Sequence, residues 1–397
     1  MKILVCWDDA AQAELMRLYL NVDESGVVIT TDPDAFLKLV ESNQKWDAIL
    51  VTTSHPDYDT AFETFDRVRE LRPEMPIIAA CMQDDVYRLA RYLTSGLRAY
   101  LIRDAAGDFM FLLHAVLEGA VSQVNAERER LIAEKLRKEI DSVRQLQESI
   151  IPHDISTPDG YEIVARYESS QIRVIGGQPV TMAGGDYYDA FTLPDDSMIL
   201  LVGDASGHGM KACMSIMTMH TLIRMIRYDE FREPALFVEY VNRQLCNQSV
   251  VNAEGGFITL LYGVLNPKNH ELTWAAAGHQ PPLLHRLDDD TIGEVADSRE
   301  CAGLPIGIVP DATYETHKCV IPPHSRLMLY TDGLVEAFPA NGDEHQEFGL
   351  EGVTRTLRRS KGEDLSSLLK NLFEDSNKFT EGQGRHDDTS IVLVERS

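Results

Sequence analysis

The residues best placed to do chemistry are four aspartates, each in a short motif within about the last 210 residues. The motifs are Gly184-Gly185-Asp186, Asp204-Ala205-Ser206-Gly207-His208-Gly209, Thr331-Asp332-Gly333 and Asp387-Asp388-Thr389-Ser390. Each adjoins an apolar stretch typical of a β-strand, such as residues 198–202 before Asp204. Carboxylates at strand ends, with glycine permitting close backbone approach, can converge on one pole of a β-sandwich. An all-oxygen cluster suits Mg²⁺ or Mn²⁺ and indicates a metal-dependent hydrolase.

Taken singly, each motif also has a purely structural explanation. Asp332-Gly333 alone would usually be a turn, and Gly184-Gly185-Asp186 alone could be a bulge or a hairpin. The doubled acid Asp387-Asp388 near a C-terminus would usually be a solvated loop. The functional interpretation depends on their joint occurrence, in this order, each beside a predicted strand.

Length and composition limit the possible classes of protein. A chain of 397 residues is expected to form two or three domains. Its net charge of −26 argues against non-specific binding to nucleic acid or to anionic membranes. Six scattered cysteines without a Cys-x-x-Cys pair indicate neither a disulfide framework nor a zinc site. No apolar run approaches the roughly 20 residues that span a bilayer, so a cytoplasmic protein is predicted.

The chain divides into three predicted segments. Residues 1–120 alternate short apolar runs with longer helical patterns, which predicts an α/β, doubly wound domain with a parallel sheet covered on both faces. The predicted strands are 3–5, 48–51, 77–80 and 99–102, and the predicted helices are 10–20, 33–42, 60–71, 85–94 and 107–121.

Residues 121–152 form a predicted helical linker, because residues 121–151 are dense in charge and contain no glycine or proline. Apolar residues recur at heptad spacing, interrupted by Glu139: Leu136, Val143 and Ile150 are seven apart, with Ile132 and Leu146 at the complementary positions. This spacing fits a two-stranded coiled coil or a docking helix. A solvated spacer helix is an equally good alternative. The helix is expected to end near Ile151-Pro152.

Residues 153–397 alternate short β-like runs with three helical stretches, which predicts an α+β domain in which helices flank a β-sandwich. The predicted strands include 161–167, 257–265, 271–277, 282–286, 326–330 and 390–395, and the predicted helices are 210–228, 234–247 and 365–379.

This third segment resembles the catalytic domain of bacterial metal-dependent Ser/Thr protein phosphatases of the stage II sporulation E / RsbU branch, in the PPM superfamily. The resemblance covers about 240 residues. Besides the four aspartate motifs, it rests on residues 146–152, 257–265, 276–284, 303–307 and 331–337. Residues 168–177 form a longer approach to Gly184 than is usual in the family, either a β-hairpin at the substrate entrance or an idle loop.

The resemblance implies roles for individual residues around two ions, Mn²⁺ or Mg²⁺. Asp204 would bridge both ions, and the carbonyl of Ala205 would complete one coordination sphere. Asp332 and Asp387 would hold one ion, and Asp186 would bind directly or through water. The remaining candidates have weaker roles: Asp189 and Asp388 would support the ligands, His279 would support its loop, and His208 would protonate the leaving seryl oxygen or serve only as a loop histidine.

The first segment resembles a response-regulator receiver domain through residues 2–5, the acidic pair Asp8-Asp9 and residues 96–104. Its chemistry differs from that family at three positions: Thr52 stands where the phosphoacceptor aspartate is expected, Cys81 at the switch Ser/Thr position and Arg103 at the lysine position. A threonine hydroxyl cannot form the acyl phosphate. The resemblance therefore implies a pseudo-receiver that an upstream regulator controls by binding.

Together these interpretations predict a phosphatase output domain that acts on a phosphorylated STAS-domain protein, an anti-sigma factor antagonist, in partner switching. The protein is expected to be a homodimer through the linker helix, with no nucleic-acid or membrane partner. Two alternatives remain open. One is a pseudophosphatase that sequesters a phosphoprotein, and the other is a hydrolase of small-molecule phosphates.

Overall fold

The protein, described here by a computed structural model, forms two compact units, Met1–Leu136 and Arg137–Ser397. The structure describes residues 1–20, 26–104, 107–152, 154–172, 180–181, 183–207, 209–226, 232–248, 251, 255–339, 346–381 and 387–397. Across these ranges, none of the helices combines the length and apolar character needed to cross a bilayer. The predicted domain limits, 1–120, 121–152 and 153–397, remain a prediction.

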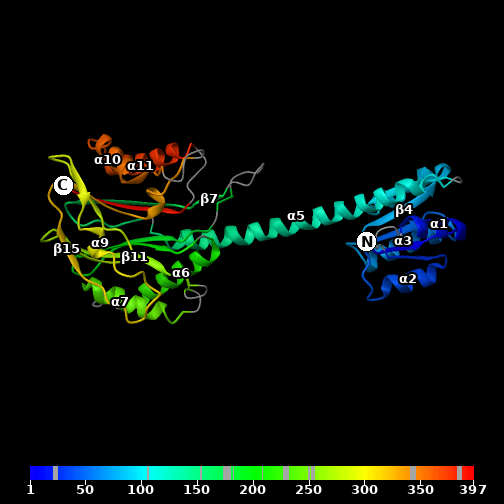
Figure 1. Ribbon diagram of the computed structural model, residues 1–397, viewed down its shortest axis with the longest axis horizontal. Helices are drawn as coiled ribbons and strands as arrows, with labels where there is room; N and C mark the ends of the chain where they lie inside the picture. Colours follow the sequence, from blue (N-terminus) through cyan, green and yellow to red (C-terminus); the bar gives the residue numbers. More distant parts are fainter. Residues whose placement is uncertain are drawn as a thin grey trace. The chain divides into compact units, whose positions relative to one another are not determined.

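The N-terminal unit is built on a five-stranded sheet in which all neighbouring strands are parallel (Figure 1). In spatial order the strands are β2 (Val27–Thr30), β1 (Ile3–Cys6), β3 (Ala48–Thr52), β4 (Ile77–Met82) and β5 (Ala99–Arg103). Helices α1 (Ala10–Leu20), α2 (Pro33–Glu41), α3 (Tyr58–Leu71) and α4 (Leu89–Thr94), the short helix η1 (Gln83–Arg88) and the start of α5 (Met110–Ile150) complete the unit.

Both faces of this sheet are buried, as the apolar runs of the sequence predict. Ile3 and Val5 of β1 point to one side and pack in a core with α1 and α5. Leu4 points to the other side and packs in a second core with α2, α3 and α4. Strands buried on both faces need nearly continuous apolar sequences, which is why these strands were predicted correctly.

Three elements of this unit differ from the prediction. The helix predicted at 85–94 is the short 3-10 helix η1 followed by α4. Strand β2 was not predicted, and its four residues are only partly buried at the sheet edge. Helix α5 is one continuous helix of 41 residues. The helix predicted at 107–121 and the linker predicted from 121 are therefore parts of the same element. Residues 120–151 contain no glycine or proline that would end the helix.

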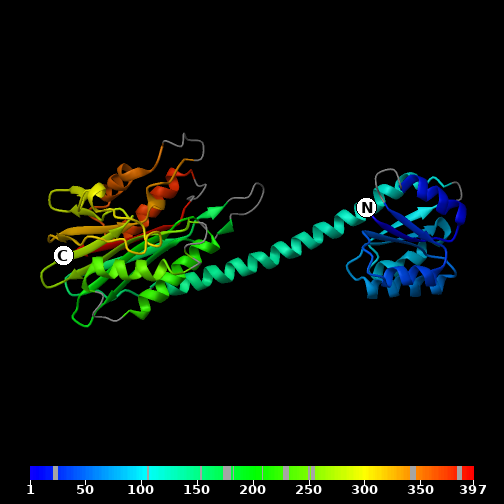
Figure 2. The same cartoon turned by 60° about the horizontal axis from the view of Figure 1, so that its bottom comes forward.

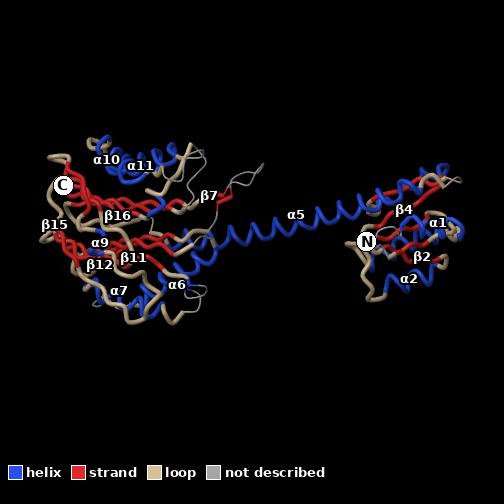
Figure 3. The backbone as a smooth tube through the Cα atoms, in the orientation of Figure 1, coloured by secondary structure: helices blue, strands red, loops and turns tan. Residues whose placement is uncertain are grey.

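The C-terminal unit is a sandwich of two five-stranded sheets between two layers of helices (Figures 1, 2 and 3). One sheet has the order β15 (His317–Val320), β12 (Glu271–Ala277), β11 (Ile258–Asn266), β10 (Met198–Ala205) and β9 (Asp186–Thr192). The other has the order β14 (Thr291–Glu294), β13 (Leu283–Arg286), β16 (Ser325–Tyr330), β17 (Thr389–Arg396) and β6 (Tyr161–Glu168).

The helices cover the outer faces of the two sheets. Helices α6 (Met210–Met225) and α7 (Pro234–Leu245) contact the sheet that contains β10, and α11 (Leu365–Phe379) contacts β6 and β17 of the other sheet, with α10 (Gly349–Arg359) beside it. On β16, Leu327 and Leu329 face the interior of the sandwich, whereas Met328 and Tyr330 face the α10–α11 layer. The alternation of side chains along the strand thus places successive residues of β16 in two different cores.

The predicted β-sandwich and its three helices are confirmed, but smaller elements were missed. Helix α10 contains Gly349 and Gly352 and was not predicted, nor were the edge strands β14 and β15 or the four-residue helix α9 (Ser298–Cys301). In the long approach to Gly184, β7 (Gln171–Ile172) pairs antiparallel with β8 (Val180–Thr181). Residues 173–179 of that approach lie outside the described residues.

One buried cation fastens the α10–α11 connection to the sheet. Arg326, which is 3% exposed, donates 2.6 Å from Nε to Glu395, 3.0 Å to the carbonyl of Ser360 and 2.6 Å to the carbonyl of Glu363. Replacing it by methionine, Arg326→Met, should lower the free energy of unfolding by about 3 kcal/mol, because the partly buried carboxylate of Glu395 and two backbone carbonyls lose a charged donor.

Hydrogen exchange followed by mass spectrometry tests this prediction: amides of β16 and β17 should exchange about a hundredfold faster or more in Arg326→Met. Arg359→Met is the control. Arg359 pairs with Asp375 at 2.8 Å but is half exposed, so its loss should cost about 0–1 kcal/mol. Equal exchange in both variants would contradict the role given to Arg326.

Candidate functional site

Strand ends bring the aspartate motifs to one end of the sandwich. Asp186 begins β9 and lies directly opposite Asp204, near the end of β10, in an antiparallel pair. In the other sheet, Asp332 follows β16 in the short helix η4 (Asp332–Leu334), and Asp387 and Asp388 precede β17. Because β16 and β17 are antiparallel neighbours, these last three residues also lie at a common end. Each sheet thus contributes carboxylates to one cluster.

Hydrogen bonds join the two sheets at this cluster. The hydroxyl of Thr331 donates to Asp186 Oδ2 at 2.6 Å and accepts from the backbone N–H of Ser390 at 2.8 Å. The carboxylate of Asp388 accepts from the N–H of Gly185 at 2.6 Å and from the N–H of Ser170 at 2.7 Å. Asp388 therefore supports the site by holding the backbone at two other strand ends.

Two glycines allow the close approach. A methyl group on Gly185 would lie 2.7 Å from the carbonyl oxygen of Ala205 and 3.2 Å from Asp204 Oδ1. A methyl group on Gly333 would overlap the carbonyl oxygen of Asp388. The N–H of Ala205 also donates to the carbonyl of Gly185 at 2.9 Å. A side chain at either glycine would push the carboxylate-bearing segments apart.

The electrostatics of the cluster are those of crowded, desolvated carboxyls. Burial, and then the charge of Asp204, raises the pKa of Asp186 well above its ordinary value. Burial together with Asp332, Asp387 and Asp388 raises the pKa of Asp204 to about 9. Burial and the charge of Asp387 also raise the pKa of Asp332. Negative charge at this position is unfavourable unless a cation compensates it.

The donor set fits divalent cations. Asp332 Oδ1 is buried and has no hydrogen-bond partner among the described residues, so a lone pair is left available. Carboxylate and carbonyl oxygens are the ligands that Mg²⁺ and Mn²⁺ prefer. Within the described ranges, however, no three His, Cys, Asp or Glu side chains are drawn together as closely as ligands of one ion.

Two other residues singled out in the sequence, Asp189 and His279, lie outside the cluster. Asp189 is completely buried and points away from Asp186, since it bonds to Tyr187 and Arg224. His279 is 2% exposed, its Nδ1 lies 3.0 Å from the carbonyl of Gln280, and burial lowers its pKa to about 4. That contact fits the supporting role expected for His279. His208 lies outside the described residues.

Sequence reasoning missed Gln147 as a site residue. This side chain near the end of α5 is 1% exposed; it accepts from the N–H of Gly184 at 2.8 Å and donates to the carbonyls of Gly184 and Asp186 at 3.0 and 3.3 Å. It therefore clamps the backbone of the Gly-Gly-Asp motif. The available signal was its place among residues 146–152, a stretch that already carries the family resemblance, close to the helix end at Pro152.

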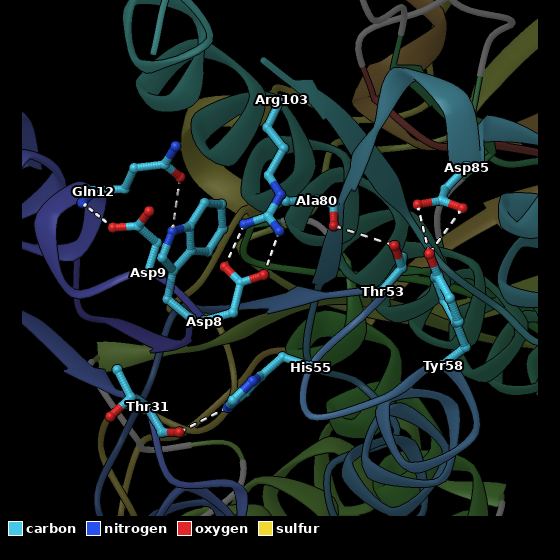
Figure 4. A network of polar contacts seen from close by, with 11 residues as sticks. Asp8, Asp9, Gln12, Thr31, Thr53, His55, Tyr58, Ala80, Asp85 and Arg103 are labelled. Atoms are coloured by element: carbon cyan, nitrogen blue, oxygen red, sulfur yellow. Dashed lines mark hydrogen bonds and ion pairs between the residues drawn. The ribbon is translucent and has the colours of Figure 1, made fainter. Parts of the chain in front are cut away.

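In the N-terminal unit, the acidic pair at the end of β1 is already engaged (Figure 4). Both carboxylate oxygens of Asp8 accept hydrogen bonds from the guanidinium of Arg103. Asp9 accepts from the N–H groups of Ala11 and Gln12 at 2.8 and 3.0 Å and so caps the start of α1. The guanidinium of Arg103 also lies 5.0 Å from the ring centroid of Trp7.

The other two receiver-like positions are buried. The hydroxyl of Thr52 has no hydrogen-bond partner within the described part of the chain. The next residue, Thr53, points to the carbonyl of Ala80 at 3.5 Å, a long contact (Figure 4). Cys81 is completely buried, and burial raises the pKa of its thiol. Thr52 and Cys81 therefore supply neither the acceptor carboxylate nor the exposed hydroxyl expected at these positions of a receiver domain.

Comparisons with known proteins place the C-terminal unit. The family model of Stage II sporulation protein E (SpoIIE) matches residues 194–397, more than half of the chain. Phosphoserine phosphatase RsbU of Bacillus subtilis is 23% identical over 318 residues, which is 79% of this chain and 86% of that protein. Protein IcfG of Synechocystis sp. is 27% identical over 287 residues, 66% of this chain but 42% of IcfG, so the match spans less than half of IcfG.

The fold has a solved counterpart in the SiaA-PP2C domain of Pseudomonas aeruginosa, with a TM-score of 0.52 and 18% sequence identity over 67% of this chain and 98% of that domain. This likeness concerns the fold alone. The family match contains Asp204, Asp332 and Asp387, three of the four aspartates that the sandwich brings together. The chain belongs to the stage II sporulation protein E (SpoIIE) family of PPM-type protein serine/threonine phosphatases.

Proposed function

We propose that this protein is a metal-dependent phosphatase that removes phosphate from serine or threonine of a partner protein in a partner-switching pathway. One observation carries the proposal: carboxylates from four strand ends converge, and burial and mutual repulsion raise the pKa values of Asp186, Asp204 and Asp332. Such a cluster is costly for a folded protein unless cations neutralise it. A module that only sequesters a phosphoprotein has no need of that cost.

The chain's own residues divide the work between ligands and supports. Asp204, Asp332 and Asp387, with the carbonyl of Ala205, would hold two ions, and Asp186 would bind directly or through water. When bound, divalent ions activate water and neutralise phosphoryl oxygens. Thr331 keeps Asp186 oriented through its 2.6 Å bond, and Asp388 keeps the Gly185 backbone in place. No Cys or Ser nucleophile is needed.

The substrate we propose is a phosphorylated STAS-domain protein. The support is family membership together with the match to RsbU, which is named a phosphoserine phosphatase. A sequestering pseudophosphatase and a hydrolase of small phosphate esters are the competing functions. The retained carboxylates disfavour the first, and no glycine-rich nucleotide loop in the sequence favours the second.

The N-terminal unit would act as a pseudo-receiver that an upstream regulator controls by binding. Its sheet order, β2-β1-β3-β4-β5, is that of the flavodoxin-like class, to which receiver domains belong. Arg103 occupies the carboxylate of Asp8, which a receiver would use for Mg²⁺. Thr52 replaces the phosphoacceptor. Both features support control without aspartyl phosphorylation.

The linker would dimerise and transmit the regulator's signal. Ile132, Leu136 and Leu146 on α5 are each more than half exposed, so an apolar stripe is available for a second copy. Near its end the same helix carries Gln147, which bonds to the Gly184 and Asp186 backbone. A regulator could change activity by this route only if it favours one of two states of the catalytic unit.

Metal dependence is the first test. Activity toward p-nitrophenyl phosphate should require added Mn²⁺ or Mg²⁺. Asp204→Asn should lower turnover by more than about a hundredfold, because loss of a residue that only hydrogen-bonds to a metal ligand already costs about 10–100-fold. The variant should remain folded by circular dichroism, since it relieves carboxylate repulsion. Asp288→Asn, at a carboxyl whose side chain is 75% exposed, is the control.

Full activity of Asp204→Asn after exhaustive chelation would defeat the two-metal proposal. Comparing p-nitrophenyl phosphate with a phosphorylated STAS-domain protein separates the alternatives. Turnover of both supports a protein phosphatase. Binding of the phosphoprotein without turnover of either would indicate a sequestering module, and turnover of small esters alone would indicate a small-molecule hydrolase.

Acetyl phosphate should leave residues 1–120 unmodified, because a threonine at position 52 cannot form an acyl phosphate and Arg103 already pairs with Asp8. Mass spectrometry before and after hydroxylamine treatment measures this. A hydroxylamine-labile phosphate on Asp47, Asp57 or Asp59 would show that the acceptor had been misplaced.

Polar substitution of the linker stripe should weaken dimerisation and change phosphatase activity together. We expect the double variant Leu136→Asn, Val143→Asn to lose apolar burial between helices, and sedimentation equilibrium combined with turnover measures both effects. The matched control is Lys135→Asn, Ser142→Asn, which has the same spacing at two exposed positions. A wild-type protein that is monomeric at every accessible concentration would leave α5 as a tether.

A further inference from the structure

Asp189 is a completely buried carboxylate that the carboxylate cluster does not use. Along β9 the side chains alternate, so that Asp186 lies on the side of Thr331 and the second sheet, while Tyr187 and Asp189 lie on the side of α6. Asp189 therefore stands three residues from a proposed metal ligand but faces a different layer. A buried carboxylate of this kind is expected to have a partner.

Helix α6 provides that partner. The guanidinium of Arg224, in the last turn of α6, lies 2.8 Å from Asp189 Oδ2. The hydroxyl of Tyr187 donates to the same oxygen at 2.8 Å, and the N–H of Ala190 donates to Oδ1 at 2.9 Å. Burial raises the pKa of Asp189, and the nearby Arg224 opposes that rise.

His220 joins Asp189, Arg224 and Tyr187, and the hydrogen bonds indicate which of its ring nitrogens carries the proton. His220 Nδ1 lies 2.7 Å from the hydroxyl oxygen of Tyr187. Because that hydroxyl has one proton and donates it to Asp189, His220 must donate from Nδ1. Burial, and then Arg224, lowers the pKa of His220, which agrees with a neutral ring. The chain of donors runs from His220 through Tyr187 to Asp189.

The other end of α6 also contacts the Gly-Gly-Asp segment. The methyl group of Ala212, in the first turn of α6, lies 3.2 Å from where a Cβ on Gly185 would be. Helix α6 also begins only five residues after Ala205. The register of α6 along β9 therefore affects the two backbone segments that carry Asp186 and Ala205.

We propose that Tyr187, Asp189, His220 and Arg224, which we call the β9–α6 latch, are positioning residues that fix α6 against β9 and thereby strengthen divalent-cation binding at the carboxylate cluster. This inference rests on the proposed metal-dependent function. The latch does not touch the ions. It acts by fixing the first turn of α6, which packs against Gly185 and follows Ala205 in the chain.

Binding of Mn²⁺ to the full-length, metal-free protein tests the latch, with electron paramagnetic resonance measuring the free aquo ion. Arg224→Gln should raise the dissociation constant about tenfold, which is about 1.4 kcal/mol. Arg224→Lys, which keeps the charge, should recover part of the affinity. Tyr187→Phe removes only one hydroxyl and should weaken binding about threefold, so it remains informative if Arg224→Gln does not fold.

The matched control is Arg359→Gln. Arg359 on α10 pairs with Asp375 on α11, also at 2.8 Å and with a similarly exposed side chain, but in the helix layer of the other sheet. It should leave the dissociation constant within twofold of the wild-type value. Wild-type affinity in both Arg224→Gln and Tyr187→Phe, even with lowered thermal stability, would overturn the latch. A wild-type protein that binds no Mn²⁺ would instead overturn the proposed function.

Discussion

The structure of the C-terminal unit depends on one electrostatic constraint, the crowding of buried carboxyls at one end of the sandwich. Asp186 and Asp388 are each 1% exposed, and burial together with neighbouring carboxylates raises the pKa values of Asp186 and Asp204. Hydrophobic burial in the two sheets must supply the stability that this arrangement removes. The fold tolerates the cost because backbone pairing between β9 and β10 fixes Asp186 opposite Asp204, and the hydroxyl of Thr331 holds the Asp186 side chain.

That constraint explains why the sequence was informative about the site. A carboxylate needed at a strand end appears as an aspartate directly beside an apolar run, and close approach of two segments appears as a glycine. Gly185 and Gly333 both fit this rule, since a methyl group on either would collide with backbone of another segment. The sandwich followed from the same runs, because strands with one face toward each core have apolar residues at nearly every position. The doubly wound N-terminal unit was predictable for a similar reason.

What the sequence left open has a common physical cause, namely dependence on contacts between segments far apart in the chain. The partner of Asp189 is 35 residues away on α6, and Gln147 is 37 residues from Gly184. A single glutamine or arginine carries no periodic signal, so neither role can be deduced from spacing. Strand β2 and helix α10 were missed because their residues are only partly buried or include glycine, and tertiary packing decides such elements.

The segment from Gly184 to Asp189 is where the layers of the C-terminal unit meet. Gln147 holds its backbone from α5, Asp388 holds it from the second sheet, and Arg224 reaches it from α6. Each contact uses a buried polar group, and such groups are unforgiving, because loss of one partner leaves the other desolvated and unpaired. A segment held in this way has few alternative positions. The same six residues therefore contact α5, α6 and the second sheet. Because these contacts fix the backbone on both sides of Asp186, a displacement of α5 or α6 would change the position of Asp186 in the candidate metal site.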